Sequence, residues 1–222
     1  MRRLVVLRPE PGASASLQRA RAIGLEAVAM PLFAIEAVAW GMPAAGQFDA
    51  LLLTSANAVR HGGNGLEELR ALPVYAVGDA TAAAAREAGF DIAREGNGGV
   101  EQLLGSIPVG LRLLHLCGEH RIAAPATHAV PVYRSVELPP PENLSSIEGA
   151  VVAVHSPRAG GRLAELAVQL GVDRTTVRIA AISEAAAGAA GDGWAMREAA
   201  AAADDEALLA LAARLCDKPV TR

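Results

Sequence analysis

Aromatic side chains are scarce in this sequence, since Phe, Tyr and Trp make up only 3% of its 222 residues. Hydrophobic residues nevertheless reach 52%, so any buried core must be mainly aliphatic. A basic excess is also absent, because the formal net charge is −4, which argues against a nucleic-acid partner. The two cysteines, Cys117 and Cys216, lie far apart and fit no ligand spacing, so we expect a reducing, cytoplasmic compartment.

Long apolar runs and several well-known motifs are missing as well. No apolar stretch approaches the roughly 20 residues of a membrane span, so we expect a soluble protein with no membrane partner. The glycine-rich stretches 62–65 and 96–99 lack the dinucleotide-binding spacing and a Walker lysine, which favours flexible loops over phosphate binding. His115 and His120 match no zinc spacing, and Ser156 has no nucleophile-elbow motif, so we predict neither a metal site nor a serine hydrolase.

The sequence contains an internal repeat. Four short segments recur in the same order at offsets of 100 to 105 residues: 29–33 with 129–133, 54–59 with 155–159, 77–82 with 182–187, and 103–104 with 208–209. Each pair is weak alone, but the shared order indicates two related halves.

Short apolar runs alternate with Ala-, Leu-, Arg- and Glu-rich stretches in each half. The apolar runs predict strands over 4–7, 27–30, 50–53, 74–77, 112–116, 129–132, 150–154 and 178–182. The stretches between them predict helices over 13–22, 56–70, 80–88, 100–106, 158–169, 184–190 and 204–216. Alternation of this kind predicts an α/β fold with parallel sheets that helices cover on both faces.

Two extended stretches, 32–40 and 133–138, interrupt the alternation at equivalent places in the repeat. We interpret them as two antiparallel linker strands between two doubly wound domains. The first domain would comprise residues 1–35 and 139–222, and the second, inserted domain residues 36–138.

Small, hydroxylic and basic residues follow the predicted strands. Ligands of open parallel sheets bind beyond the carboxyl ends of the strands, and exposed N–H groups at helix starts favour anions. The candidate substrate-binding residues are Arg8, Ser55, Asn57, Gly78, Thr81, Cys117, Gly118, Arg121, Ser156, Arg158 and Ser183. Each Ser, Thr or Asn has an alternative interpretation as a simple helix N-cap.

Four segments resemble uroporphyrinogen-III synthases, and the resemblance extends from Leu4 to about Leu215. The segments are 54–59, 74–82, 132–135 and 155–159. The resemblance implies two α/β domains with an active site in the cleft between them, and no metal or organic cofactor. It also implies the reaction: hydroxymethylbilane, a linear tetrapyrrole, loses water and closes to uroporphyrinogen III with inversion of ring D.

The resemblance implies roles for individual residues too. Tyr133 matches a tyrosine suspected of assisting loss of the hydroxyl group, although as the counterpart of Phe33 it could instead pack against the linker. Ser55, Thr81 and Ser156 match positions near the substrate. One motif departs from the family pattern, because Ala186 stands where many relatives have a threonine.

The resemblance makes the partner of this chain a small linear tetrapyrrole. Nothing in the sequence indicates an oligomer, so we expect a monomer. Two alternatives stay open at this point: a non-catalytic two-lobed binding protein, and a vestigial synthase-like protein kept for protein contacts.

Overall fold

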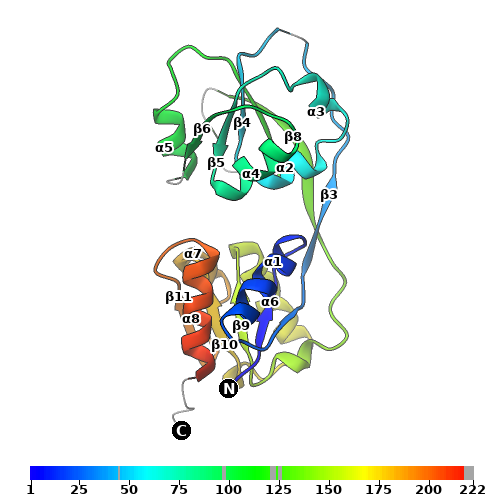
Figure 1. Ribbon diagram of the computed structural model, residues 1–222. Helices are drawn as coiled ribbons and strands as arrows, with labels where there is room; N and C mark the ends of the chain where they lie inside the picture. The colour runs from blue at the N-terminus through cyan, green and yellow to red at the C-terminus, as the bar shows by residue number, and fades with distance from the viewer. Residues whose placement is uncertain (45, 97–98, 121–123, 125–126, 218–222) are drawn as a thin grey trace. The chain divides into compact units, whose positions relative to one another are not determined.

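A computed structural model describes residues 1–222 except 45, 97–98, 121–123, 125–126 and 218–222 (Figure 1). The chain forms two compact units. Unit 1 comprises Met1–Ala34 and Glu137–Arg222, and unit 2 comprises Ile35–Val136. Unit 2 is therefore one continuous stretch of chain, whereas unit 1 is built from two.

Unit 1 contains a five-stranded sheet in the order β11-β10-β9-β1-β2, in which all neighbouring strands are parallel. The strands are β1 (Leu4–Val6), β2 (Ala27–Ala29), β9 (Val151–Val154), β10 (Arg178–Ala181) and β11 (Met196–Ala199). The central strand β9 and its neighbours β1 and β10 are buried along their whole length. Burial on both faces explains why β1 and β9 are continuously aliphatic, and why β10 is aliphatic apart from the buried Arg178.

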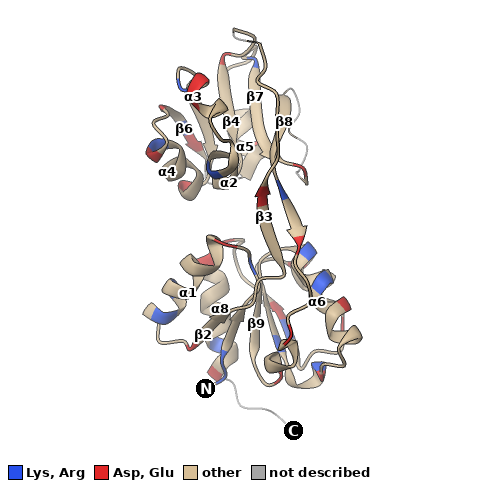
Figure 2. Ribbon diagram, turned by 90° about the vertical axis from the view of Figure 1, so that its right-hand side faces the viewer, with Lys and Arg blue, Asp and Glu red and all other residues tan. Residues whose placement is uncertain are grey.

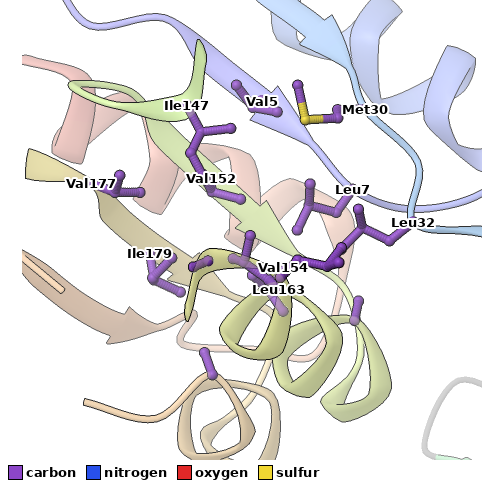
Figure 3. Packing of buried hydrophobic residues seen from close by; sticks show 14 of the residues in the cluster. Val5, Leu7, Met30, Leu32, Ile147, Val152, Val154, Leu163, Val177 and Ile179 are labelled. Atoms are coloured by element: carbon purple, nitrogen blue, oxygen red, sulfur yellow. The ribbon is translucent and has the colours of Figure 1, made fainter. Parts of the chain in front are cut away.

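Helices cover both faces of this sheet. The helices are α1 (Gly12–Ala22), α6 (Pro157–Gln169), α7 (Glu184–Ala189) and α8 (Asp205–Asp217), with 3-10 turns η1 (Leu144–Ile147) and η2 (Arg174–Thr176). Val5 and Val152 belong to the cluster that contains Leu163 of α6 (Figure 3). Leu4 and Val6 point to the opposite face, where they join residues of α1 and α8.

Unit 2 contains a six-stranded sheet in the order β3-β8-β7-β4-β5-β6, with parallel pairing from β8 to β6. Its strands are β3 (Phe33–Ala37), β4 (Ala50–Leu53), β5 (Val74–Val77), β6 (Ile92–Gly96), β7 (Leu113–Gly118) and β8 (Thr127–Glu137). Its helices are α2 (Ala56–His61), α3 (Gly65–Glu68), α4 (Asp79–Glu87) and α5 (Gly99–Gly105). Leu51 and Leu53 pack on the side of α2 and α4, whereas Leu52 packs beside Leu103 of α5.

The strands β3 and β8 carry the chain between the units, and their backbone bonds are antiparallel. Val38 N donates to Val132 O at 2.9 Å, and Leu138 N donates to Leu32 O at 3.0 Å. On the exposed side, Arg134 pairs with Glu36 at 3.0 Å, where Figure 2 shows a basic segment of β8 beside an acidic segment of β3.

The two sheets have the same topology once the chain order is permuted. In spatial order, β8, β7, β4, β5 and β6 correspond to β2, β1, β9, β10 and β11. The repeated segments fall on equivalent elements, because 54–59 follows β4 and 155–159 follows β9. The predicted α/β fold with parallel sheets is confirmed. Unit 1 is a circular permutation of unit 2, since its β1 and β2 come first in the chain and β7 and β8 come last in unit 2.

One predicted helix was wrong, two stretches predicted as extended form a single strand, and two strands were missed. The predicted helix over 56–70 is two short helices, because the chain turns at Gly62 and Gly63, and Gly63 has a φ of 65°. The predicted strand over 129–132 and the extended stretch over 133–138 are one long strand, β8. The short strands β6 and β11 were not predicted at all.

Candidate functional site

Three serines cap helices at the carboxyl ends of buried strands. Ser55 follows β4 and accepts a hydrogen bond from Asn57 N at 3.2 Å. In unit 1, Ser156 accepts from Ala159 N at 3.2 Å, and Ser183 accepts from Ala186 N at 3.3 Å. The capping role considered for these residues is therefore present in both units. Their hydroxyl groups also lie at the sheet edge where ligands of parallel sheets bind.

Glycine rather than serine precedes helix α4. Gly78 has a φ of 81°, a conformation that side chains disfavour, and its N–H donates to Gly96 O at 2.8 Å. Thr81 lies in the first turn of α4 and is buried, so little of its side chain meets the solvent. Asn57 lies in the first turn of α2 and is half-buried. These residues share the carboxyl edge of the unit 2 sheet with Ser55.

Tyr133 lies on β8 against the end of β7. A Cβ atom added to Gly118 would lie 2.8 Å from Cε2 and 3.1 Å from the hydroxyl oxygen of Tyr133. The absence of a side chain at Gly118 is therefore what lets the tyrosine ring lie across the end of β7. The ring also faces His61 at a centroid distance of 6.3 Å, a neighbour that the sequence analysis did not single out. Burial lowers the pKa of His61, with a further contribution from Arg60, which favours its neutral form.

The expectation for Cys117 needs correction. Strand β7 runs on through Gly118, so Cys117 is a strand residue rather than part of a following turn. Its side chain is 1% exposed, and its thiol donates to Val130 O at 3.6 Å. The thiol is therefore not available to a substrate. Arg121, the other candidate after β7, lies outside the described residues.

A polar cluster that the sequence did not reveal lies at the carboxyl edge of unit 1. Asp205 begins α8, and its Oδ1 accepts from His155 Nε2 at 2.7 Å, Ser16 Oγ at 2.8 Å and Arg8 Nη1 at 3.3 Å. Its Oδ2 accepts from Arg19 Nε at 2.8 Å and Nη2 at 2.7 Å. We call these five residues the Asp205 cluster. It brings together the ends of β1 and β9 with α1 and α8.

The protonation states within the Asp205 cluster follow from its burial. Burial alone would raise the pKa of Asp205, but hydrogen bonds from His155, Ser16 and Arg19 outweigh it and hold the pKa below its ordinary value. Burial lowers the pKa of His155, and this outweighs the raising effect of the bond to Asp205. At neutral pH the aspartate is therefore charged and the histidine neutral.

Arg158 and Ala186 complete the unit 1 edge. Arg158 is exposed in the first turn of α6, and its guanidinium lies 4.7 Å from the ring centroid of Phe33. Ala186, the residue at which the resemblance implied a departure from the family pattern, is fully buried in α7. Its N–H bonds to Ser183 Oγ, so the serine supplies the hydroxyl group at this helix start.

In the described part of the chain, no group of three or more His, Cys, Asp or Glu residues is placed to hold a metal ion. No helix among the described residues is long and apolar enough to cross a bilayer.

The fold and the two polar sheet edges define a class: a doubly wound α/β protein whose strand ends present hydroxyl groups, helix N-termini and arginines, which suit a polyanionic ligand. The sequence model of the family described as uroporphyrinogen-III synthase HemD matches residues 14–210. The chain therefore belongs to the uroporphyrinogen-III synthase family. Its activity is that of a cyclising lyase, which converts hydroxymethylbilane to uroporphyrinogen III in heme biosynthesis.

Solved structures show the same fold at low sequence identity. The uroporphyrinogen-III synthetase of Helicobacter pylori is 17% identical, with a TM-score of 0.67 over 97% of this chain and 100% of that one. A mutant uroporphyrinogen III synthase of the extremely thermophilic bacterium Thermus thermophilus is 19% identical, with a TM-score of 0.54 over 96% of this chain and 98% of that one. No curated protein matches the sequence.

Proposed function

We propose that the carboxyl edge of each sheet binds carboxylates of hydroxymethylbilane and that Tyr133 assists the loss of its hydroxyl group. The observation that carries this proposal is the repeated placement of helix starts at strand ends in both units, with Ser55 in unit 2 and Ser156 and Ser183 in unit 1. These caps place hydroxyl groups at the equivalent edge of both sheets, where ligands of parallel sheets bind.

Helix capping and substrate binding are compatible functions of these serines. A hydroxyl group has two acceptor lone pairs and one donor proton. Ser55 Oγ accepts from a helix N–H, so its proton remains able to donate to a substrate carboxylate. The helix starts add N–H groups that lack intrahelical partners, together with the positive end of the helix dipole. Arg8 and Arg158 add positive charge in unit 1. We therefore expect single serine substitutions to weaken binding only modestly.

The reaction requires loss of the hydroxyl group from ring A and a folded arrangement of the linear tetrapyrrole. The C–O bond at the hydroxymethyl carbon of ring A breaks, the pyrrole supplies the electron pair, and the hydroxyl group leaves as water after taking up a proton. The Tyr133 ring lies across Gly118 at the strand end, which supports the proposal that its hydroxyl group hydrogen-bonds to the leaving oxygen. The substituted carbon of ring D then attacks the freed carbon and becomes a quaternary spiro centre. Its older bond, to the methylene carbon of ring C, breaks, this methylene bonds to the other α-carbon of ring D, and loss of the proton there restores the pyrrole with ring D inverted. Holding the chain folded for this attack can contribute roughly 7–11 kcal/mol to catalysis.

We also propose that the chain works as a monomer in the cytoplasm, without a metal or organic cofactor. The measured mass of the purified protein in solution tests the first statement, and full activity after exhaustive chelation tests the last.

The decisive experiment is a coupled assay with freshly generated hydroxymethylbilane, in which the oxidised products are separated by isomer. Spontaneous closure gives the I isomer, so enzyme-dependent III isomer supports the proposal. Formation of the I isomer alone, from folded and monodisperse protein, contradicts it.

A further inference from the structure

The Asp205 cluster is more than a helix cap. One carboxylate, 14% exposed, accepts hydrogen bonds from two arginines, a serine and a histidine, which come from helix α1 and from the turns after β1 and β9. Ser16 is fully buried, and the His155 side chain is 7% exposed. The arginines extend outward from this buried centre, because the Arg8 and Arg19 side chains are 31% and 51% exposed.

We propose that Arg8 and Arg19 form a paired guanidinium site for one substrate carboxylate, and that Asp205 is the positioning residue that holds the pair. This inference rests on the proposed function and deepens it, because it assigns one carboxylate-binding site. Arg19, Asp205, Ser16 and His155 were not among the residues expected from the sequence to serve the substrate.

The charge balance of the cluster favours an anionic ligand. Two guanidinium groups face one carboxylate and a neutral histidine, so the cluster carries a net positive charge. Arginine presents a planar fork of five N–H donors, which matches a carboxylate better than the point charge of lysine does. Asp205 already orients the Nε and Nη2 groups of Arg19. A pair fixed in this way loses less conformational entropy when it binds a ligand.

The position of the Asp205 cluster in the fold also suits a ligand-binding site. Arg8 follows β1, His155 follows β9 and Asp205 begins the helix that follows β11, so all three lie at the carboxyl edge of the same parallel sheet. The matching edge of unit 2 carries Ser55 and Tyr133. An ion pair of the same chemical type exists at the opposite edge of unit 2, where Arg112 precedes β7 and Asp49 precedes β4, with Nη2 to Oδ1 at 2.7 Å. This pair provides a matched control.

Two roles of Asp205 predict opposite results for Asp205→Asn. If Asp205 acted only through its charge, its removal would relieve repulsion of the substrate and lower KM. If it positions the arginines, its removal lets them separate and raises KM. We expect Arg19→Gln and Asp205→Asn each to raise the KM for hydroxymethylbilane by about tenfold and to change kcat by no more than about twofold. Each variant loses a charge-assisted hydrogen bond between an arginine and the substrate carboxylate, and the loss of one such bond corresponds to about a tenfold change in affinity. Asp49→Asn should leave both parameters unchanged.

The double variant tests whether Asp205 acts through Arg19. If it does, Asp205→Asn adds little in an Arg19→Gln background, so the two effects are not additive. Binding of uroporphyrin I, an octacarboxylate that can be followed by fluorescence, should weaken in parallel and give a readout independent of turnover. If Asp205→Asn does not fold, Arg19→Gln at its half-exposed position still tests the paired site.

The outcomes separate this inference from the proposed function. If wild-type protein forms the III isomer while Arg19→Gln retains wild-type KM and uroporphyrin binding, the paired site is wrong and the proposed function stands. Additive effects, or a lowered KM for Asp205→Asn, refute the positioning role. If wild-type protein forms no III isomer but binds uroporphyrin I through Arg19, the proposed function fails and the anion site survives.

Discussion

Gly160 and Gly161 are neighbours in α6, yet the structure predicts opposite effects for replacing each with alanine. A Cβ atom on Gly160 would lie 2.7 Å from Ala186 O and 3.0 Å from Ala190 N, both backbone atoms at α7. A Cβ atom on Gly161 would lie 3.9 Å from Ala189 O, an ordinary contact distance. The two helices thus pack closely at the first glycine and leave room at the second.

The expected magnitudes follow from two opposing contributions. Alanine in place of glycine inside a helix stabilises by roughly 0.5–1 kcal/mol, and this gain is common to both variants. Gly160→Ala must also push α6 and α7 apart, because the contacted atoms are backbone, and such overpacking costs about 1–3 kcal/mol. We therefore expect Gly161→Ala to be stabilising and Gly160→Ala to be destabilising. Their difference in unfolding free energy isolates the packing cost.

The sequence offers a convenient probe for this measurement. It contains two tryptophans, Trp40 in unit 2 and Trp194 in unit 1, so a Trp40→Phe background reports unit 1 alone. Urea unfolding followed by Trp194 fluorescence should give a lower midpoint for Gly160→Ala than for Gly161→Ala, at an unchanged slope. Equal midpoints, or the reverse order, would refute the close packing of α6 on α7.

Three further predictions concern the polar sheet edges. Tyr133→Phe should lower kcat by about 100-fold with little change in KM, since a proton donor is lost; an unchanged kcat in the isomer assay would exclude the assigned role. Gly118→Ala should displace the Tyr133 ring and lower kcat by about 10- to 100-fold, whereas Gly105→Ala, with open space around its Cβ, should not. The pKa of His155 is lowered in the folded protein. As the pH falls below about 6.5, the unfolded state therefore binds more protons than the folded state does. The free energy of unfolding of unit 1 should then decrease by at most about 1.4 kcal/mol per pH unit. In His155→Gln this slope between about pH 7 and about pH 5 should become shallower in Trp194-monitored urea unfolding, and an equal slope would contradict the assignment.

The parts of the fold that sequence reasoning predicted correctly are those where burial dictates composition. Leu51 to Leu53 and Val151 to Val154 are continuous aliphatic runs because both faces of their sheets are covered. Strands β6 and β11 were missed because they lie at the outer edges of their sheets, where charged side chains such as Arg94 and Arg197 are tolerated. Their apolar pattern is correspondingly weak.

The candidate site could be predicted only where it follows directly from a strand end. Ser55, Ser156 and Ser183 were found because each stands between a buried strand and a helix. Asp205 was not found, because an acidic residue at a helix start is an ordinary feature. Its partners lie 189 positions away at Ser16, 186 at Arg19 and 50 at His155, so no local pattern links them.

The permuted order of the strands has a consequence for how the protein forms during synthesis. Strand β1 lies inside its sheet, but its partner β9 is made much later, since Leu4 pairs with Val151. Unit 2 is continuous from Ile35 to Val136, so all its parallel strands are available before β9 emerges. Domains fold as units, and long-range strand pairing is slow. The inserted unit can therefore complete its fold before β9, β10 and β11, the other strands of the unit 1 sheet, have been synthesised. Until β9 arrives, the aliphatic β1 strand depends on α1 and β2 alone for protection from aggregation.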